Sequence, residues 1–349
     1  MSVPRLDPDA LTRGPAVDPT PLYRSRDELY ADDLLIAALN GFDFFTWLEA
    51  HPSSIAEIAR HFGFHERPVD VMTTLFVARA LAVRDDGVLR LTPLAREHLV
   101  SSSPWFLGPY FPRVSDRPIA RDLLEILRNG QPANFASRKD TDDWHKAMEE
   151  ETFAEEFLAA MDVRGRFTAH ALAGGLALHG RRRLLDVAGG TGIFACTLAA
   201  RFPDLRATVL EKPPVDRIAT RTIARRGFAS QVDVIASDML NDPLPRGYDA
   251  HLFSNVLHDW DVPVVRRLLQ ASAAALPPGG EIIIHDAFLE AGKNGPAQIA
   301  AYSVLLLHVT QGRCYAVDEM ADWLRADGFD SPTHVPGGAL RSALVARKL

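Results

Sequence analysis

Residues 184–213 read LLDVAGGTGIFACTLAARFPDLRATVLEKP and contain the pattern that decides the fold. A first apolar run reaches Asp186 and breaks into glycines. An apolar-periodic stretch then leads to a second apolar run that ends at Glu211. This order predicts a strand, a glycine turn, a helix and a second strand with an acid at its tip. Two different ribose-containing cofactors are bound by such an arrangement, and the stretch alone leaves both open.

The alternation of strands and helices continues through the C-terminal half of the chain. Strands are predicted at 183–188, 207–212, 232–238, 248–255 and 281–288, with weaker ones near 333 and at 342–348. A series of this kind predicts an α/β fold with a parallel, doubly wound sheet. In such sheets, ligands bind at the carboxyl ends of the strands.

The spacing of the glycines favours S-adenosylmethionine over a dinucleotide. A dinucleotide fingerprint is Gly-x-Gly-x-x-Gly at the start of a helix. Here Gly189, Gly190 and Gly192 are followed by two bulky residues, so the last glycine of that pattern is missing. Asp186 precedes the turn, where its charge would repel a pyrophosphate but could orient water or the amino group of a methionine moiety.

Two other predicted strand ends fit the same cofactor. Glu211 can accept hydrogen bonds from two ribose hydroxyls. At the end of the third strand, Asp238 can accept a hydrogen bond from an adenine amine, and Met239 can pack on the ring. An NAD-dependent oxidoreductase is the disfavoured alternative because of the missing glycine.

A candidate base follows the fourth strand, in LFSNVLHDWD at residues 252–261. His258 lies about one turn beyond the strand end, where a neutral histidine can take a proton from a hydroxyl. Asp286 ends the fifth strand beside it, and a carboxylate bonded to the imidazole would fix its tautomer. The chain has 12 histidines, most of which are not expected to be catalytic, and His285 within the strand reads equally as a core group.

Composition excludes several classes of protein. A net charge of −7 over 349 residues argues against nucleic acid as a partner. Two scattered cysteines, Cys196 and Cys314, form neither a disulfide framework nor a metal cluster, so we expect no metal and a reducing, cytoplasmic setting. The longest apolar stretch is far shorter than the roughly 20 residues a bilayer requires, and the N-terminus lacks the apolar core of a signal peptide.

The N-terminal part predicts short helices over residues 27–100. SSIAEIARHFG begins with Ser54 as a helix N-cap, a second helix follows, and Asp86-Gly87 joins two alternating strands as a hairpin. Two helices plus a hairpin form a winged helix. Residues 57–80 carry zero net charge and the second helix is mostly apolar, which favours packing or dimerisation over DNA binding.

Two flanking regions carry weaker patterns. Residues 1–20 are rich in proline and aspartate and are expected to be loose. Residues 117–176 are expected to be helical, with Phe153, Phe157 and Met161 four apart on one face, a stripe that is usually core.

The segments LLDVAGGTG, VLEKP, SDML, NVLHDWD and PPGGEIIIHD resemble those of class I S-adenosylmethionine-dependent O-methyltransferases. The subgroup is the one typified by plant caffeic acid O-methyltransferases and by bacterial polyketide and aromatic O-methyltransferases. The resemblance covers about residues 20–349. It implies a homodimer with a helical, winged-helix dimerisation and lid domain at 1–176, and a Rossmann-like, S-adenosylmethionine-binding catalytic domain at 177–349.

The resemblance also implies roles for single residues. His258 falls on the family's general base, Asp259 on a substrate-facing position and Asp286 on a second acid. The cofactor contacts are expected at Asp186, Gly189, Gly190, Glu211, Asp238, Met239, Ser254 and Asn255. An aromatic, apolar substrate pocket is expected to include Phe157, Met161, Trp260 and Tyr302.

The implied reaction is methylation of a phenolic or enolic hydroxyl on a small aromatic or polyketide-type secondary metabolite. The chain departs from the family at two positions, because Ala188 replaces the first glycine of the turn and Cys314 replaces a further acid near the C-terminus. The second departure keeps an alternative open. In that alternative the chain is a non-methylating relative, a decarboxylase, hydroxylase or pericyclase that retains S-adenosylmethionine.

Overall fold

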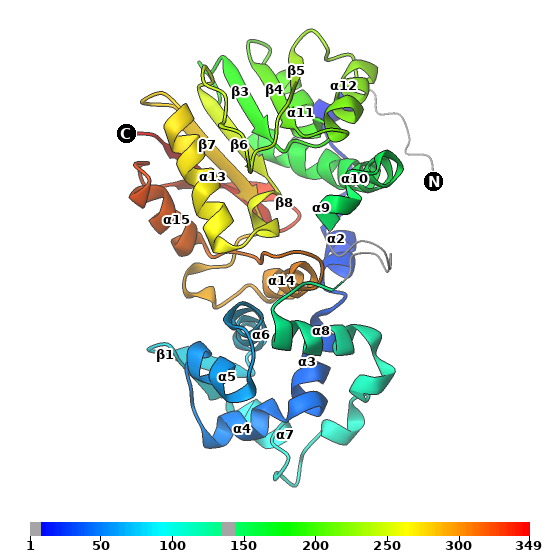
Figure 1. Ribbon diagram of the computed structural model, residues 1–349, viewed down its shortest axis with the longest axis vertical. Coiled ribbons are helices and arrows are strands. Elements are labelled where there is room, and N and C mark those ends of the chain that lie inside the picture. The colour runs from blue at the N-terminus through cyan, green and yellow to red at the C-terminus, as the bar shows by residue number, and fades with distance from the viewer. Residues whose placement is uncertain (1–7, 134–143) are drawn as a thin grey trace. The chain divides into compact units, whose positions relative to one another are not determined.

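The computed structural model describes residues 8–133 and 144–349 (Figure 1). The described residues group by their contacts into two compact units. The sheet unit comprises residues 8–21, 144–288 and 317–349, and the helical unit comprises residues 22–133 and 289–316. This grouping does not follow chain order, so the boundary expected between residues 176 and 177 stays a prediction.

The sheet unit is built on one mixed sheet. Its strands are β3 (Arg183–Val187), β4 (Arg206–Glu211), β5 (Val232–Ala236), β6 (Ala250–Ser254), β7 (Glu281–Asp286), β8 (Thr333–Gly338) and β9 (Arg341–Arg347). Their spatial order is β5-β4-β3-β6-β7-β9-β8. The first five pair in parallel, which confirms the predicted doubly wound sheet. The strand β9 runs the other way: it pairs antiparallel with β7 and with β8, and the short link between β8 and β9 can join only antiparallel strands.

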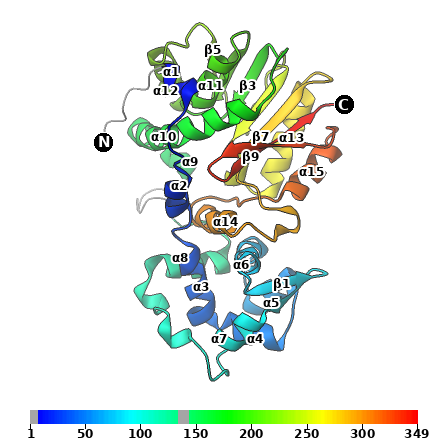
Figure 2. The same cartoon turned by 180° about the vertical axis from the view of Figure 1, so that it is seen from behind.

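Helices cover both faces of this sheet. The helices of this unit are α1 (Pro8–Arg13), α9 (Trp144–Ala147), α10 (Glu151–Gly175), α11 (Ile193–Arg201), α12 (Val215–Arg225), α13 (Val262–Ala275) and α15 (Val317–Ala326), with the 3₁₀ turn η5 (Leu257–Asp259) after β6. Figure 1 shows α13 in front of the sheet, and Figure 2 shows α10 and α11 on the opposite face. The glycine turn between β3 and α11 therefore lies at the carboxyl edge of the sheet, on the side covered by α10.

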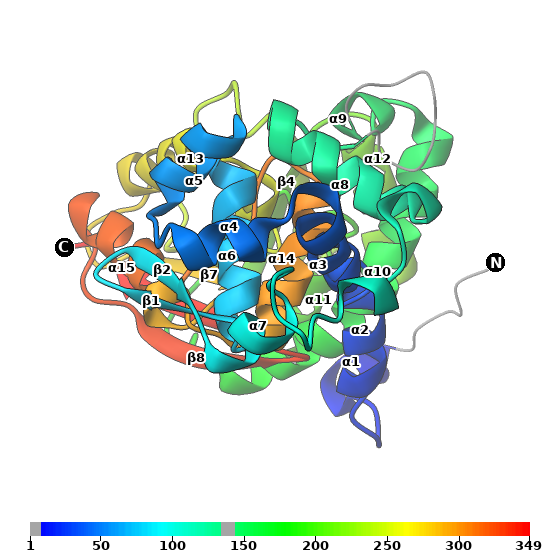
Figure 3. The ribbon, with the colours of Figure 1, turned by 90° about the horizontal axis from the view of Figure 1, so that it is seen from below.

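The helical unit contains the elements predicted near the N-terminus. They are α3 (Ala31–Ile36), η1 (Ala37–Gly41), α4 (Phe44–Ala50), α5 (Ile55–Phe62), α6 (Glu66–Ala78), β1 (Ala82–Asp85), β2 (Val88–Leu91), α7 (Pro93–His98), η2 (Gly108–Tyr110), η3 (Val114–Asp116), α8 (Pro118–Asn129), η6 (Ala291–Lys293) and α14 (Ala297–Val309). This unit begins at Leu22, within the helix α2 (Thr20–Asp27). Late in the sequence, α14 returns to pack against α3, α6 and α8 (Figure 3).

Local rules explain the predicted helix start and hairpin. The Ser54 side chain and the Glu57 side chain cap each other's backbone N–H groups at the start of α5, which is a complete capping box. Asp86 and Gly87 have φ values of 47° and 76°, the left-handed pair that a tight two-residue hairpin requires.

The core of the sheet unit lies between the sheet and its helices. Leu184, Val209, Leu252 and Ile283 from four strands are fully buried there, together with Cys196 of α11. Burial of one such aliphatic side chain contributes about 1.5–3 kcal/mol. These contacts hold the strand ends, and with them the site, in one arrangement.

The expectation that residues 1–20 are loose is wrong for part of that range. Residues 8–13 form α1, and Leu11 is buried in the core of the sheet unit. The free energy of burying that leucine outweighs the weak helix preference of a Pro- and Asp-rich segment. Residues 1–7 lie outside the described part of the chain. Among the described helices, none is long and apolar enough to cross a bilayer.

Candidate active site

Four predicted site residues lie at the carboxyl ends of adjacent parallel strands. Asp186 lies near the end of β3, Glu211 ends β4, Ser254 ends β6 and Asp286 ends β7. Neighbouring parallel strands end at one edge of a sheet, so these side chains are brought to the same edge.

The glycine turn is held in conformations that favour glycine. Gly190 and Gly192 have φ values of 58° and 74°, in the left-handed region. A Cβ atom on Gly189 would lie 2.6 Å from the Asp186 carboxyl carbon, so only glycine fits over that acid. Ala188, at the first departure from the family pattern, also has a positive φ of 53°, which costs about 1–2 kcal/mol in a residue with a Cβ atom.

Two acids beside the turn have raised pKa values. Burial raises the pKa of Asp186 to about 7, and neither of its carboxyl oxygens has a hydrogen-bond partner among the described residues. Burial likewise raises the pKa of Glu211 to about 7, while its Oε1 accepts the Gly190 N–H at 2.8 Å. Carboxyls that lose hydration in this way gain stability from a ligand that supplies positive charge or donors.

In the loop after β5, the Asp238 carboxylate accepts hydrogen bonds from residues of the same loop. Asp238 Oδ1 accepts from the Leu240 N–H at 2.9 Å, and Oδ2 accepts from the Asn241 amide at 2.8 Å. Asp238 and Met239 are both half-buried. Each Asp238 oxygen keeps a lone pair for a further donor, so the expected adenine contact stays a prediction.

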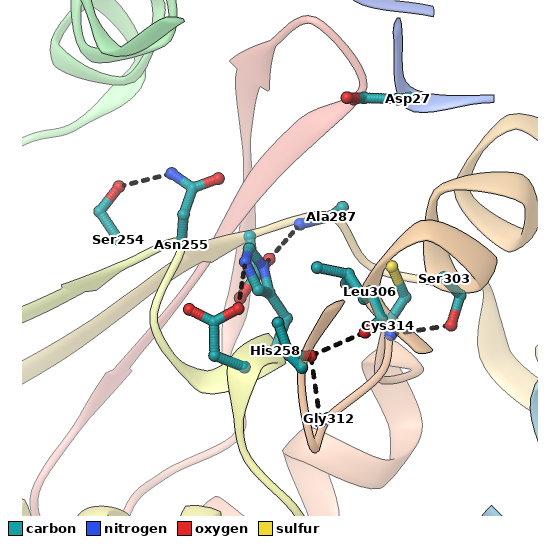
Figure 4. A network of polar contacts seen from close by, with 12 residues as sticks. Asp27, Ser254, Asn255, His258, Ala287, Ser303, Leu306, Gly312 and Cys314 are labelled. Atoms are coloured by element: carbon teal, nitrogen blue, oxygen red, sulfur yellow. Dashed lines mark hydrogen bonds and ion pairs between the residues drawn. The ribbon is translucent and has the colours of Figure 1, made fainter. Parts of the chain in front are cut away.

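A histidine and two acids form the most strongly charged group of the site. His258 on η5 is 3% exposed, and its Nδ1 contacts Oδ1 of Asp286 (Figure 4). The same Asp286 oxygen accepts the Ala287 N–H at 2.7 Å. On the other side of the ring, His258 Nε2 lies 3.5 Å from Asp259 Oδ1.

The electrostatics of the two acids differ. Burial would raise the pKa of Asp286, but the charge and hydrogen bond of His258 outweigh it and hold that pKa below its ordinary value. Burial raises the pKa of Asp259 to about 6. Asp286 is therefore the ionised partner of the imidazole at neutral pH, and Asp259 is the acid that changes charge most easily.

The neighbouring histidine behaves as a core group. His285 on β7 is fully buried, and burial lowers its pKa to about 3. Its Nδ1 lies 2.8 Å from Ser254 Oγ, which also accepts from the Asn255 amide at 3.1 Å. A histidine that stays neutral supports the reading of His285 as structural, while Asn255 Oδ1 is buried without a hydrogen-bond partner in the described chain.

The expected pocket residues are divided between the units. Phe157 and Met161 are half-buried on α10, and Trp260 is buried just after η5, all in the sheet unit. Tyr302 is buried on α14 in the helical unit. Cys314 is also buried there, with its N–H donated to Ser303 Oγ at 3.0 Å (Figure 4).

A buried ion pair beside the glycine turn was not predicted from the sequence. Asp162 on α10 contacts Arg226, which follows α12, and both also contact Thr191 of the turn. The sequence contains one signal for it. Asp162 follows Leu158 by four residues, so it lies on the same helix face, and the other residues of that face are buried.

Comparison with known proteins decides the family. The protein-family model of the O-methyltransferase domain matches residues 121–330 of the chain. The chain belongs to the S-adenosylmethionine-dependent O-methyltransferases. It is 33% identical over 312 residues to the 3-hydroxy-5-methyl-1-naphthoate 3-O-methyltransferase of Streptomyces sahachiroi, covering 89% of each chain.

Two further similarities bear on this O-methyltransferase. The crystal structure of an O-methyltransferase family 2 protein from Planctomyces limnophilus, in complex with apigenin, superposes with a TM-score of 0.88 at 31% identity, covering 100% of both chains. The aclacinomycin 10-hydroxylase RdmB of Streptomyces purpurascens is 31% identical over 211 residues, which is 59% of this chain and 55% of that protein.

The residues at the turn fit the family's cofactor. S-adenosylmethionine carries a cationic methionine end and a ribose, and Asp186 offers two unpartnered, buried carboxyl oxygens. Because Gly189 has no Cβ atom, the space beside the Asp186 carboxyl group stays open. Within residues 8–133 and 144–349, no group of three or more side chains is arranged to hold a metal ion.

Proposed function

We propose that this enzyme methylates a phenolic or enolic hydroxyl of a small aromatic, polyketide-type metabolite, with His258 as general base. The observation that carries the proposal is the buried contact of His258 Nδ1 with Asp286 at the carboxyl edge of the sheet. Relatives named for a naphthoate and crystallised with apigenin support an aromatic substrate. The half-buried Phe157 and Met161 and the buried Trp260 supply apolar and aromatic surface for such a ring.

Asp286 orients the base. Its ionised carboxylate accepts the Nδ1–H of His258, which fixes the neutral tautomer with a lone pair on Nε2. That nitrogen takes the proton from the substrate hydroxyl, and the negative charge of Asp286 stabilises the resulting imidazolium. Asp259, 3.5 Å from Nε2, adds negative charge on the side where the proton arrives.

S-adenosylmethionine, when bound, supplies a methyl group on a sulfonium that leaves as a neutral thioether. Transfer of that methyl group to the substrate oxygen would give the methyl ether and S-adenosylhomocysteine. Asp186, Gly189, Gly190, Glu211, Asp238, Met239, Ser254 and Asn255 are the proposed cofactor contacts. Because little covalent chemistry is required of the protein, holding both reactants in line provides much of the rate.

A second candidate function is a non-methylating reaction on the same fold. The similarity to a 10-hydroxylase and the cysteine at position 314 favour keeping it. Incubation of the purified enzyme with methyl-labelled S-adenosylmethionine and a panel of hydroxynaphthoates, flavones and catechols separates the two. Label in the aromatic product supports methylation, whereas a substrate that is consumed without gaining label supports the alternative.

Donor affinity is expected to rise as the pH increases from about 6 to about 8. The pKa values of Asp186 and Glu211 are raised to about 7, so both are largely protonated at the lower pH in the donor-free protein. A cationic donor binds the ionised forms, which makes binding about tenfold weaker at the lower pH for each carboxyl that must ionise. Calorimetry at both pH values measures this, with Glu211→Gln removing one contribution. Equal affinities would contradict the assignment.

We also propose that the helical unit forms a homodimer and does not bind DNA. Leu94, Trp105, Leu107 and Tyr110 expose large apolar side chains, between 44% and 86% of each residue. Large apolar side chains exposed to this degree within one short segment are typical of an interface. Light scattering at micromolar concentration should give a dimer, and Trp105→Asp combined with Tyr110→Asp should give a monomer.

The matched control for the dimer is Val163→Asp, at an exposed position on α10 of the sheet unit, which should remain dimeric. A wild-type monomer, or salt-sensitive binding to duplex DNA, would count against the proposal. For location, we propose a reducing, cytoplasmic setting, supported by the small number of cysteines and by the burial of both as thiols.

A further inference from the structure

A buried ion pair joins three elements of the sheet unit beside the glycine turn. Asp162 on α10 and Arg226 at the C-terminal end of α12 contact each other, and both are less than one tenth exposed. The Thr191 hydroxyl donates to Asp162 Oδ1 at 2.5 Å, and Arg226 Nη1 donates to the Thr191 carbonyl at 2.8 Å. One ion pair therefore holds both the side chain and the backbone of a residue in the turn.

The helix that carries Asp162 lies directly on this turn. A Cβ atom on Gly190 would lie 3.3 Å from Leu158 Cδ2, and one on Gly165 would lie 2.7 Å from Ile193 Cγ2 at the start of α11. Asp162 stands between Leu158 and Gly165 along α10, so it faces the middle of the contact. The turn is thus held on one side by Glu211, through the Gly190 N–H, and on the other by this pair.

Stability alone does not account for such a pair. Burying two charges carries a desolvation cost that an apolar pair of similar size would avoid, so a buried ion pair is weak evidence of added stability. What the charges do here is bind the Thr191 carbonyl and hydroxyl in fixed directions, which apolar side chains cannot do. Arg166 adds a second cation, with Nη2 3.3 Å from Asp162 Oδ2, so both carboxylate oxygens are used.

We propose that Asp162 and Arg226 are positioning residues that act through Thr191 to hold the glycine turn in the conformation that binds the methyl donor. The inference rests on the proposed donor site at the turn. Gly190 and Gly192 permit many backbone conformations, and an unanchored turn would have to be ordered when the donor binds. The pair removes that cost before binding.

The main test removes both charges together, as Asp162→Asn combined with Arg226→Gln, so that neither partner of this pair is left as a buried charge without the other. We expect the double variant to keep a cooperative thermal unfolding transition but to bind S-adenosylhomocysteine at least about tenfold more weakly by calorimetry. Thr191→Val, which lacks the hydroxyl, should lose affinity in the same direction. Thr191→Ser, which keeps the hydroxyl, should restore it.

A second measurement needs no ligand. Amide hydrogen exchange of residues 188–192 in the donor-free protein should be faster in the double variant than in the wild type, because the turn opens more often. Exchange in β6, whose described residues form no hydrogen bond or ion pair with Asp162 or Arg226, should be unchanged. Faster exchange throughout the sheet unit would indicate general destabilisation and contradict a positioning role.

The chain offers a matched control between the same two helices. Glu151 on α10 and Arg221 on α12 form an exposed ion pair at 3.1 Å that does not contact the turn. Glu151→Gln should leave affinity for S-adenosylhomocysteine within about twofold of the wild-type value. An equal loss in this control, or wild-type affinity in the folded double variant, overturns the proposal. A wild-type protein that fails to bind S-adenosylhomocysteine would instead refute the donor site, and this inference with it.

Discussion

Replacement of His258 by alanine is expected to lower kcat for a phenolic substrate by at least about 100-fold, within the range that a general base contributes. The variant removes the group that accepts the hydroxyl proton but leaves the acids of β3 and β4 untouched, so donor affinity should stay within about twofold of the wild-type value. Steady-state kinetics and calorimetry together measure both quantities. The loss should be smaller for a substrate whose hydroxyl is more acidic, since less of its barrier lies in proton removal.

Two variants test this assignment further. Asp286→Asn keeps the imidazole but removes the charge that stabilises its protonated form, so a smaller loss of kcat than that of His258→Ala is expected. His334→Ala replaces an exposed histidine on β8 of the same unit and should have no effect on kcat. If His258→Ala instead retained nearly full turnover, His258 would be excluded as the general base, and holding the two reactants in line would account for the rate.

Replacement of Glu211 by alanine is expected to weaken donor binding by about 1.5–3 kcal/mol, the contribution of hydrogen bonds to a charged group, or roughly 10- to 150-fold in Kd. The carboxylate is the proposed acceptor for the ribose hydroxyls, and it also accepts the Gly190 N–H. Its loss therefore removes a ligand contact and loosens the turn. The kcat at saturating donor should change much less, because the proposed contact of Glu211 is with the ribose and not with the reacting atoms.

The controls for Glu211 separate its two contacts. Glu211→Gln keeps an oxygen for the Gly190 N–H but removes the charge, so its Kd should lie between those of the wild type and the alanine variant. Asp233→Ala removes an exposed acid from the adjacent strand β5 and should bind the donor normally. Calorimetry that finds unchanged affinity in Glu211→Ala would remove Glu211 from the proposed donor site.

Much of the site could be predicted from sequence because its residues follow regular elements. Asp186, Glu211, Ser254 and Asp286 lie at or near strand ends, and parallel strands place their ends at one edge whatever the details of packing. The pairing of His258 with Asp286 was expected for the same reason and is confirmed as a contact. The glycine turn, the capping box at Ser54 and the hairpin at Asp86 are set within a few residues of chain.

Other features depend on contacts between distant segments, which no local pattern specifies. The helix α1 exists because Leu11 is buried in a core formed mainly by residues that follow it by more than 150 positions. The return of α14 to pack with α3, α6 and α8 interleaves the two units along the chain. The antiparallel pairing of β8 and β9 depends on a short link that the strand pattern alone did not distinguish.

The sequence by itself thus determined the order of strands and helices, the proposed donor-binding edge and the candidate base, since these follow from periodicity, turn chemistry and position along regular elements. Only the tertiary structure decided which charges are buried and what each one contacts. Burial raises the pKa values of Asp186 and Glu211 to about 7, and long-range packing brings Asp162, Arg226 and Thr191 together from three separate segments. Desolvation and charge pairing depend on distances in space, and these distances cannot be inferred from how far apart the residues lie along the chain.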